Sequence, residues 1–379
     1  MVHHGAARRE VVVVGGGIAA LETVLALHAL AHEVVHVTVV APDDAFALSS
    51  LSVSWLFERG AGRRLRWSEA MDEHAGRLVR TTVTKVDTTR RRVCCRDGTT
   101  VPYDVLVLAP GAVPTPVLPS SVTLDPGRPD TVAAVTQAVE LGWSRAVALV
   151  VPSGRTWPLP LYEVALLIAA RVRDRYGVAL HLVSAERMPL AVFGAAASDA
   201  VARRLTAAGI MFHGGVATRL VAWQALDVGA ALPLRVDHVV ALPLLGGPGM
   251  AGVPADRDGF IPTDETGRVT EADGVWAVGD ATGQPIEHGG IAGQQADAIA
   301  ARIAAEAGAA VGEIPSDLVL RARLPTDSGD LYLQRPIGAQ DGEASDVPLW
   351  SPPAAVAGHH LAAYLERKGL ALDSSAGVR

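Results

Sequence analysis

Residues 11–20 read Val-Val-Val-Val-Gly-Gly-Gly-Ile-Ala-Ala, and this segment predicts the class of fold. Four consecutive β-branched residues are typical of a strand that is buried on both faces of a parallel sheet. The glycines then open a helical segment that ends near Leu30, and a second apolar strand follows at residues 34–40. A strand, a glycine turn, a helix and a second strand within about 30 residues make up the βαβ unit of a dinucleotide-binding fold.

The glycine turn has the spacing Gly15-x-Gly17-x-x-Ala20. The first glycine allows a tight turn, the second lets the backbone approach a pyrophosphate, and the small third residue lets the helix pack closely on the strand. The N-terminus of the helix offers free N–H groups and a partial positive charge to the phosphates. The motif therefore predicts dinucleotide binding through Gly15, Gly17 and Ala20.

The acidic residue that usually holds a ribose is missing from the end of the second strand, where Ala41 stands. Asp43 and Asp44 follow closely in the sequence. Two interpretations stay open. In the first, one of these carboxylates binds the ribose. In the second, the Pro-Asp-Asp sequence forms an ordinary solvated turn. We name Asp43 as a candidate for cofactor binding.

A second signal comes from residues 270–280, which read Thr-Glu-Ala-Asp-Gly-Val-Trp-Ala-Val-Gly-Asp. A buried strand that ends at Gly279-Asp280 places one carboxylate where a ribityl hydroxyl can donate to it. The Ala-rich helix expected at residues 290–307 directs its N-terminal amides to the same region. A third segment, Ala109-Pro110-Gly111, ends another apolar strand.

These three motifs lie in register over residues 10–310 and together resemble the flavoproteins with two dinucleotide-binding domains, the pyridine nucleotide-disulfide oxidoreductase superfamily. That group includes glutathione-reductase-type enzymes, type II NADH dehydrogenases and sulfide:quinone oxidoreductases. The resemblance implies an α/β fold with two Rossmann-like, glutathione-reductase-like domains and a small C-terminal extension. It also implies FAD as the cofactor. The residues that it assigns to FAD binding are Gly15, Gly17, Ala20, Asp43, Ala109, Gly111, Gly279, Asp280 and Gly290.

The chain divides into four expected segments. Residues 1–115 and 241–312 form the two parts of the FAD-binding domain, and residues 116–240 form a second, degenerate NAD-type domain. Residues 313–379 form a Pro- and Asp-rich C-terminal segment with one expected helix, at residues 354–367. The remaining expected elements are strands at 77–86, 91–95, 100–103, 105–109, 146–151 and 178–183, strands around 234–242, and helices at 161–173 and 198–208.

The second domain lacks the glycine loop that NAD(P)H-using relatives have. Residues 151–163 read Val-Pro-Ser-Gly-Arg-Thr-Trp-Pro-Leu-Pro-Leu-Tyr-Glu. Proline removes backbone N–H donors, and the tryptophan fills space that a pyrophosphate would need. Glu186 is the remaining candidate for a ribose partner in this domain. The loop argues against NAD(P)H binding and resembles the sulfide:quinone oxidoreductase-like branch, as do residues 46–53 and 349–353.

The sequence contains two cysteines, Cys94 and Cys95. They are adjacent on an expected strand, so their side chains point to opposite faces and are poorly placed for a disulfide. Sulfide oxidation needs a cysteine pair beside the flavin, and disulfide reductases need a Cys-x4-Cys motif, because a thiolate must attack and be formed again. The sequence therefore predicts neither thiol-based chemistry nor a metal site.

The resemblance places Glu163 and Glu287-His288 near the flavin. Two interpretations of Glu163 stay open: it relays protons as a buried carboxyl, or it is an acidic residue at a helix start that only interacts favourably with the helix dipole. His288 acts as an acid/base group, or it is a hydrogen-bonded structural histidine. Relatives often carry a lysine before the glycine pair, and Glu287 stands there in this chain. We name Glu163 and His288 as the catalytic candidates.

Composition narrows the range of partners. Of 379 residues, 49% are hydrophobic and 19% are charged, and the formal net charge is −7. This excludes a disordered chain and argues against nucleic acid as a partner. The apolar stretches are too short for a spanning helix and the N-terminus is no signal peptide, so we expect a cytoplasmic protein without stable membrane insertion. The expected C-terminal helix packs on its own chain or forms a homodimer contact.

These features predict an FAD-dependent oxidoreductase that acts on a small-molecule substrate by electron or hydride transfer. Two alternatives stay open. One is an NAD(P)H-dependent flavin reductase that passes electrons to a quinone or protein acceptor. The other is a flavin-binding subunit whose redox site has degenerated, which the altered second loop and Glu287 suggest.

Overall fold

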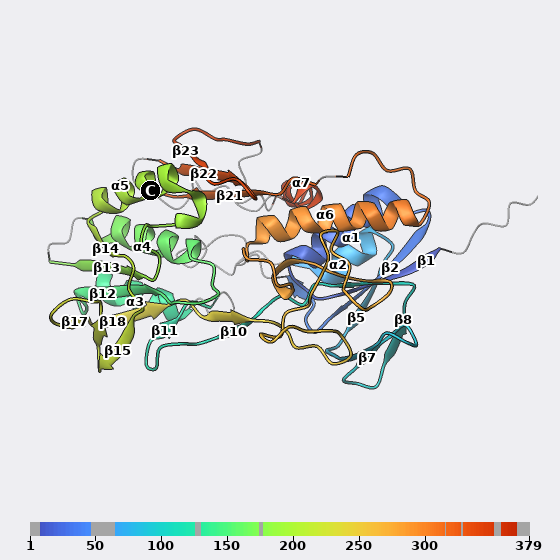
Figure 1. Ribbon diagram of the computed structural model, residues 1–379, viewed down its shortest axis with the longest axis horizontal. Coiled ribbons are helices and arrows are strands. Elements are labelled where there is room, and N and C mark those ends of the chain that lie inside the picture. Colours follow the sequence, from blue (N-terminus) through green and yellow to red (C-terminus); the bar gives the residue numbers. More distant parts are fainter. Residues whose placement is uncertain are drawn as a thin grey trace, which may run out of the picture.

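The computed structural model describes residues 8–46, 65–125, 130–173, 177–314, 316–326, 329–351 and 358–369. The chain forms two α/β lobes side by side, one at the right and one at the left of Figure 1. Each lobe is built on a five-stranded parallel sheet. The predicted fold class, with tandem Rossmann-like domains, is confirmed.

The first sheet has the strand order β20-β9-β1-β2-β5. Its strands are β1 (Arg9–Val14), β2 (Val35–Ala41), β5 (Arg77–Arg80), β9 (Val105–Leu108) and β20 (Val275–Ala277). In β1, Val11 and Val13 pack toward the helices, whereas Val12 and Val14 pack toward the other face. A continuous β-branched run suits this strand because both of its faces are buried.

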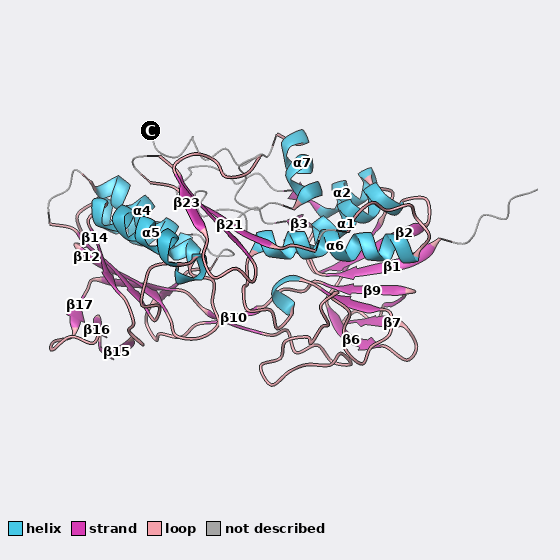
Figure 2. Ribbon diagram, turned by 45° about the horizontal axis from the view of Figure 1, so that its top comes forward, coloured by secondary structure: helices cyan, strands magenta, loops and turns pink. Residues whose placement is uncertain are grey.

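Helices and a small sheet cover the two faces of this first sheet (Figure 2). One face carries α1 (Ile18–Ala31) and α6 (Gly289–Glu306), which pack on each other, together with α2 (Trp67–Glu73). The other face carries an antiparallel sheet of β6 (Val83–Asp87), β7 (Arg92–Cys95) and β8 (Thr100–Pro102). Asp44 also lies beside a short strand pair, β3 (Ala45–Phe46) with β4 (Leu65–Arg66).

The prediction of a single strand at residues 77–86 is wrong. The structure divides it into β5, which pairs with β2 in the parallel sheet, and β6, which belongs to the antiparallel sheet. Between them the N–H of Thr81 donates to the carbonyl of Ala41, and the carbonyl of Thr82 accepts from Arg96. Strand-forming valines and threonines continue across the junction, so the local sequence does not reveal that the chain changes sheets.

The second sheet has the order β11-β18-β12-β13-β14. Its strands are β11 (Val122–Thr123), β12 (Ala146–Val151), β13 (Ala179–Ser184), β14 (Ile210–His213) and β18 (His238–Ala241). The helices of this domain are α3 (Asp130–Glu140), α4 (Leu159–Val172) and α5 (Ala195–Ala207), with a short 3-10 helix, η3 (Ala191–Phe193). The sequence predicted α4 and α5 within a few residues but not α3.

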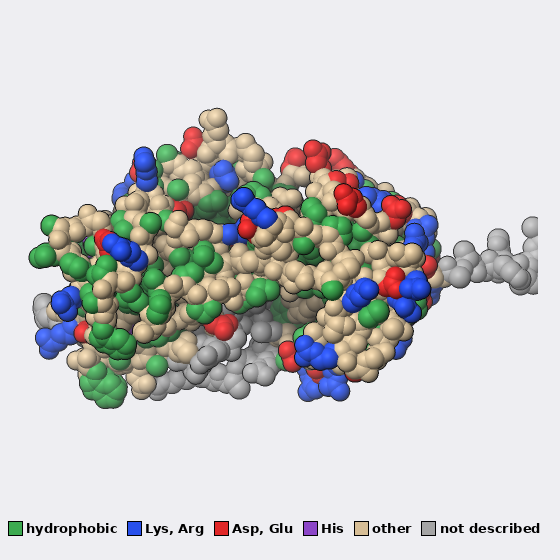
Figure 3. Space-filling view, turned by 60° about the horizontal axis from the view of Figure 1, so that its bottom comes forward, with side chains coloured by type: hydrophobic (Ala, Val, Ile, Leu, Met, Phe, Trp, Pro, Cys, Tyr) green, Lys and Arg blue, Asp and Glu red, His purple; other side chains and the backbone are tan. Residues whose placement is uncertain are grey.

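An antiparallel sheet of β15 (Arg219–Ala222), β16 (Ala225–Asp227) and β17 (Leu234–Arg235) extends this domain. Most of the exposed large hydrophobic side chains belong to the second domain, among them Leu141, Trp143, Val221, Trp223 and Leu232. Hydrophobic side chains are accordingly frequent over the left end of the face in Figure 3. A two-stranded ribbon of β10 (Val113–Thr115) and β19 (Leu244–Gly246) runs between the lobes.

The C-terminal segment forms more structure than the one expected helix. An antiparallel sheet of β21 (Val319–Leu324), β22 (Leu331–Pro336) and β23 (Glu343–Ser345) packs on α4 and α5. Every second side chain of β21 is buried. The helix itself, α7 (His359–Arg367), packs on α1 and α6 of its own chain, and residues 352–357 lie outside the described residues. In the described part of the chain, no helix combines the length and the hydrophobicity that a bilayer crossing requires.

Candidate functional site

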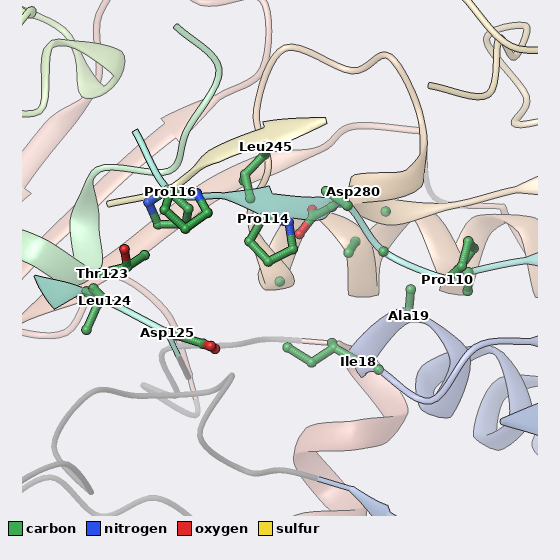
Figure 4. A pocket seen from close by; sticks show the side chains of 18 of the residues that line it. Ile18, Ala19, Pro110, Pro114, Pro116, Thr123, Leu124, Asp125, Leu245 and Asp280 are labelled. Atoms are coloured by element: carbon green, nitrogen blue, oxygen red, sulfur yellow. The ribbon is translucent and has the colours of Figure 1, made fainter. Parts of the chain in front are cut away.

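A cavity of about 670 Å³ lies where the two domains meet. Its size falls within the range of small-molecule and cofactor sites. Figure 4 shows residues of both domains around it, with Ile18 and Ala19 from α1, Asp280 from the first domain, and Thr123, Leu124 and Asp125 from the second. Five of the predicted FAD-binding residues line it, namely Gly17, Ala109, Gly111, Gly279 and Asp280.

The two glycines of the first motif have different structural roles. Gly15 has a φ of +134°, and a Cβ there would lie 2.0 Å from the carbonyl oxygen of Ala109. Gly15 is therefore required for the contact between the loop and β9. Gly17 has an ordinary φ of −97°, and a Cβ there would meet nothing within 4 Å. Because Gly17 lines the cavity, its missing side chain leaves that space open to a ligand.

Two helix N-termini border the cavity. Helix α1 begins after Gly17 and helix α6 begins after His288, and no described side chain caps either of them. Ile18 and Ala19 of α1 and Gly289 of α6 line the cavity. Free N–H groups and the helix dipole make such an end a binding site for an anion. Two of them around one cavity suit a ligand that carries negative charge.

Asp280 supplies a carboxyl group to the cavity wall (Figure 4). It lies in a short 3-10 helix, η4 (Gly279–Ala281), directly after β20. Gly279 has a φ of +70°, and a Cβ there would lie 3.1 Å from the Cβ of Ala292, so glycine lets η4 pack against α6. Burial raises the pKa of Asp280 to about 6. A half-buried carboxyl at this position fits a hydroxyl of a bound ligand.

The other predicted cofactor residues do not line the cavity. Gly15 supports the loop, and Ala20 is fully buried in α1, where a small residue allows close packing. Gly290 is buried in the first turn of α6. Asp43 is exposed at the end of β2. A role for Asp43 at a ribose stays a prediction.

Asp44, the neighbour of Asp43, has a structural role. Its carboxylate accepts the backbone N–H of Ser68 at 2.8 Å and forms an ion pair with Arg66 at 2.8 Å. These contacts hold the pKa of Asp44 below its usual value, the Ser68 hydrogen bond having the largest effect. They position α2, and the indole N–H of Trp67 in that helix donates to the carbonyl of Gly16 at 3.3 Å.

Glu163 is buried in α4, and it is not among the described residues that line the cavity. Burial raises its pKa to about 8, and Arg323 of β21 opposes this only in part. The carboxyl is therefore largely protonated at neutral pH. A proton-transfer role for Glu163 stays a prediction.

His288 directly precedes Gly289, which lines the cavity. It is buried, its Nδ1 has no hydrogen-bond partner among the described residues, and its ring lies 4.8 Å from the ring of Trp157. Burial lowers the pKa of His288 to about 4. The imidazole is therefore neutral at physiological pH, and a role of His288 as an acid/base group stays a prediction.

A residue that the sequence did not single out joins the two domains. Arg155 follows β12 in the second domain and donates to Glu287 Oε1 at 3.2 Å and to the carbonyl of Gln284 at 2.9 Å. Its guanidinium lies over the ring of Phe260 at 4.2 Å. The only sequence signal was its place beside Gly154, the surviving glycine of the second loop.

The second loop makes close contacts with the rest of the protein. Gly154 has a φ of +127°, and a Cβ there would lie 2.8 Å from Leu244. Helix α4 begins with Pro158 as its N-cap and a second proline in its first turn, so fewer N–H groups are free at this end. Trp157 packs on His288 and lies 6.3 Å from the ring of Phe193.

Glu186, at the end of β13, turns toward its own domain. Its carboxylate accepts the hydroxyl of Tyr162 at 3.4 Å and backbone N–H groups of Leu190 and Ala191. Burial raises the pKa of Glu186 to about 7. The carboxyl that could have held a ribose is therefore occupied by the residues that follow it.

The cysteines agree with the prediction that they form no pair. Cys94 is half-buried, Cys95 is buried, and both are free thiols. They alternate on β7, as expected for neighbouring strand positions. Burial raises the pKa of Cys95, which makes its thiolate less available. Among the described residues, no group of three or more His, Cys, Asp or Glu side chains is arranged to hold a metal ion.

Together, these observations define a protein with two Rossmann-like α/β domains and, between them, a cavity that two helix N-termini border. The sequence pattern of the pyridine nucleotide-disulphide oxidoreductase family matches residues 9–296, and the chain belongs to this family of flavin-dependent oxidoreductases. No curated protein sequence matches the chain.

Solved structures show the same fold. The sulfide:quinone oxidoreductase of Aquifex aeolicus is 18% identical, with 89% of this chain and 87% of that chain covered and a TM-score of 0.75. A ferredoxin reductase of Rhodopseudomonas palustris is 19% identical, with 86% and 82% covered and a TM-score of 0.66. NDH2 of Plasmodium falciparum, solved in complex with NADH, is 14% identical, with 73% and 64% covered and a TM-score of 0.57.

Proposed function

We propose that this protein binds FAD in the cavity between its domains and oxidises or reduces a small-molecule substrate. The observation that carries the proposal is the joint presence of two uncapped helix N-termini and the Asp280 carboxyl around one cavity. A dinucleotide has a pyrophosphate that the helix N-termini can bind and hydroxyl groups that the Asp280 carboxyl can bind. A bound flavin accepts and passes on pairs of electrons.

Different residues would bind different parts of FAD. The N-terminus of α1 with Gly17 would hold the pyrophosphate, because no Cβ occupies the space there. Asp280 would accept a ribityl hydroxyl, and the N-terminus of α6 at Gly289 would favour negative charge on the ring system. Ala109 and Gly111 would form the wall beside them. Gly15, Ala20 and Gly290 shape the loop and helices behind these contacts.

We place substrate entry at the cavity and not at the second domain. The proline-rich loop, the packing of Trp157 and the inward turn of Glu186 support this, because they occupy the positions that a second dinucleotide would need. His288 is the nearer candidate for proton transfer, since it precedes Gly289 in the cavity wall. Glu163 is the second candidate because its pKa lies near neutrality.

The proposal is tested on the purified full-length protein. The absorption spectrum should show stoichiometric bound FAD, and anaerobic dithionite should bleach it reversibly. NADH and NADPH should leave it oxidised over many seconds in a stopped-flow instrument. A colourless protein that does not take up added FAD contradicts the proposal, and rapid bleaching by either nicotinamide favours the flavin reductase alternative.

A further inference from the structure

The ion pair between Arg155 and Glu287 lies directly behind the cavity wall. Leu245, which lines the cavity, donates its backbone N–H to the carbonyl of Arg155 at 2.8 Å. On the other side, Glu287 stands two residues before Gly289, which also lines the cavity. The pair therefore connects two parts of the wall, the β10–β19 ribbon at Leu245 and the start of α6 at Gly289.

Glu287 is almost completely withdrawn from solvent, with 2% of its side chain exposed. Arg155 holds Oε1, but Oε2 is buried without a hydrogen-bond partner among the described residues. An unsatisfied charged oxygen in such surroundings is costly, and protonation removes much of the cost. The geometry thus leaves one oxygen of Glu287 ready to carry a proton.

Two charged groups that face Glu287 act on its pKa in opposite directions. Arg155 favours the ionised carboxylate, whereas Asp280 of η4 disfavours it by like-charge repulsion. His288, the neighbour on the same segment, is neutral because burial lowers its pKa to about 4. Burial is the largest influence and, with Asp280, raises the pKa of Glu287 to about 7. A small change in local charge is therefore enough to change the protonation of this carboxyl.

The charged residues among the described cavity lining are Asp125 and Asp280, both of them acidic. No lysine or arginine of that lining is present to offset charge that arrives on a bound ligand. A two-electron reduction with uptake of one proton leaves one additional negative charge on the ligand. Like charge raises the pKa of a nearby carboxyl.

We propose that Glu287 takes up one proton from solvent when the bound flavin is reduced and releases it when the flavin is oxidised again. This inference rests on the proposed binding of FAD. Two electrons and one proton go to the flavin, the second proton goes to the free oxygen of Glu287, and the reductant supplies the electrons. Arg155 is a positioning residue that keeps Glu287 ionised in the oxidised protein.

The test measures the midpoint potential of the bound flavin against pH in the wild type, in Glu287→Gln and in the control Glu265→Gln. Glu265 is an exposed glutamate, so the chemical change is the same without the buried site. Above about pH 7, the wild type and the control should show a slope steeper by about 30 mV per pH unit than Glu287→Gln, since a tenfold change in a two-electron equilibrium corresponds to about 30 mV. Equal slopes in all three proteins overturn the inference while FAD binding stands.

A wild type without FAD overturns the proposed function and this inference together. If Glu287→Gln does not retain flavin, the inference is tested on the wild type alone. The measurement is then the infrared difference spectrum between its reduced and oxidised forms at about pH 8. A new protonated-carboxyl band supports the inference, and its absence overturns it. In Arg155→Met the band should vanish from the difference spectrum, because Glu287 is then protonated in both states. A band that is unchanged in Arg155→Met contradicts the assignment to Glu287.

Discussion

The carboxylate of Glu22 accepts the backbone N–H of Leu361 at 2.9 Å, although 339 positions separate the two residues in the sequence. The same carboxylate accepts the N–H of His360 at 2.6 Å. Glu22 belongs to α1, so the helix behind the glycine loop caps the last helix of the chain. Glu22 is fully buried, and its pKa is raised well above the usual value, mainly by burial and further by Asp297.

Substitution of Glu22 should destabilise the protein through α7. Glu22→Ala removes both acceptors from the N-terminus of α7, and the loss of a cap costs about 0.5–2 kcal/mol. The buried cavity adds to this cost, so we expect a decrease of several degrees in Tm and faster hydrogen exchange of α7. The exposed residue Glu33 serves as the control, since Glu33→Ala should change neither. An unchanged exchange rate in α7 would show that the cap has no energetic role.

Gly15 and Gly17 should respond differently to substitution. Gly15→Ala places a Cβ against the carbonyl of Ala109, so it should lower Tm strongly whether or not FAD is present. Gly17→Val places its Cβ where no protein atom lies within 4 Å, on the cavity side of the loop, so the apoprotein should keep its Tm within about 2 °C while FAD affinity falls at least about 100-fold. Thermal denaturation of the apoproteins and FAD titration measure these effects. A Gly17→Val protein that stays fully yellow would contradict the pyrophosphate assignment.

Glu163 should make the protein less stable as the pH rises. Its folded pKa of about 8 lies above the usual value, so the folded state keeps a proton that the unfolded state has lost. Its unfavourable contribution is absent below about pH 4 and grows up to about pH 8, at about 1.4 kcal/mol per pKa unit at most.

Glu163→Gln should therefore stabilise the protein more at pH 8 than at pH 5. Urea denaturation at both values measures the difference, which we expect to exceed about 1 kcal/mol. Glu366→Gln, at an exposed position of α7, should show no such pH dependence. If the two variants behave alike, the Glu163 carboxyl is not held neutral in the fold.

The cysteines should be dispensable for flavin chemistry. Cys94→Ser and Cys95→Ser change two free thiols on β7, which packs on the face of the first sheet opposite to α1 and α6. We expect FAD content and the rates of flavin reduction and reoxidation to stay within about twofold of the wild type. Rapid-mixing kinetics measure the rates. A loss of more than tenfold in either variant would return thiol chemistry to consideration.

The parts of the fold that follow from a single local pattern could be predicted from the sequence. The valine run gave β1, and the glycine spacing gave the start of α1 and its place at the cavity. The alternation in β21 was also present in the sequence, but the prolines and aspartates around it made the segment look irregular. Sheet membership of β5 and β6 depends on partners that are distant in the sequence, so no local pattern reveals it.

The site was harder to predict than the fold because its chemistry depends on contacts between segments. Asp44 and Glu186 carry the right group for a ribose, but they accept hydrogen bonds from Ser68 of α2 and Tyr162 of α4 instead. Arg155 becomes part of the site only because the fold brings it to Glu287. The low pKa of His288 comes from burial, which the sequence at that position does not show.

The closed loop of the second domain has a consequence for protein engineering. The second domain keeps the parallel sheet of a dinucleotide-binding fold, yet the prolines at the start of α4, Trp157 and Glu186 fill the region after β12 and β13 with contacts inside the protein. A substitution that removes one of these contacts leaves the others in place, so we expect no single substitution to create nicotinamide binding. Under the proposed function, engineering of nicotinamide binding therefore requires a graft of the whole loop together with the segment after β13.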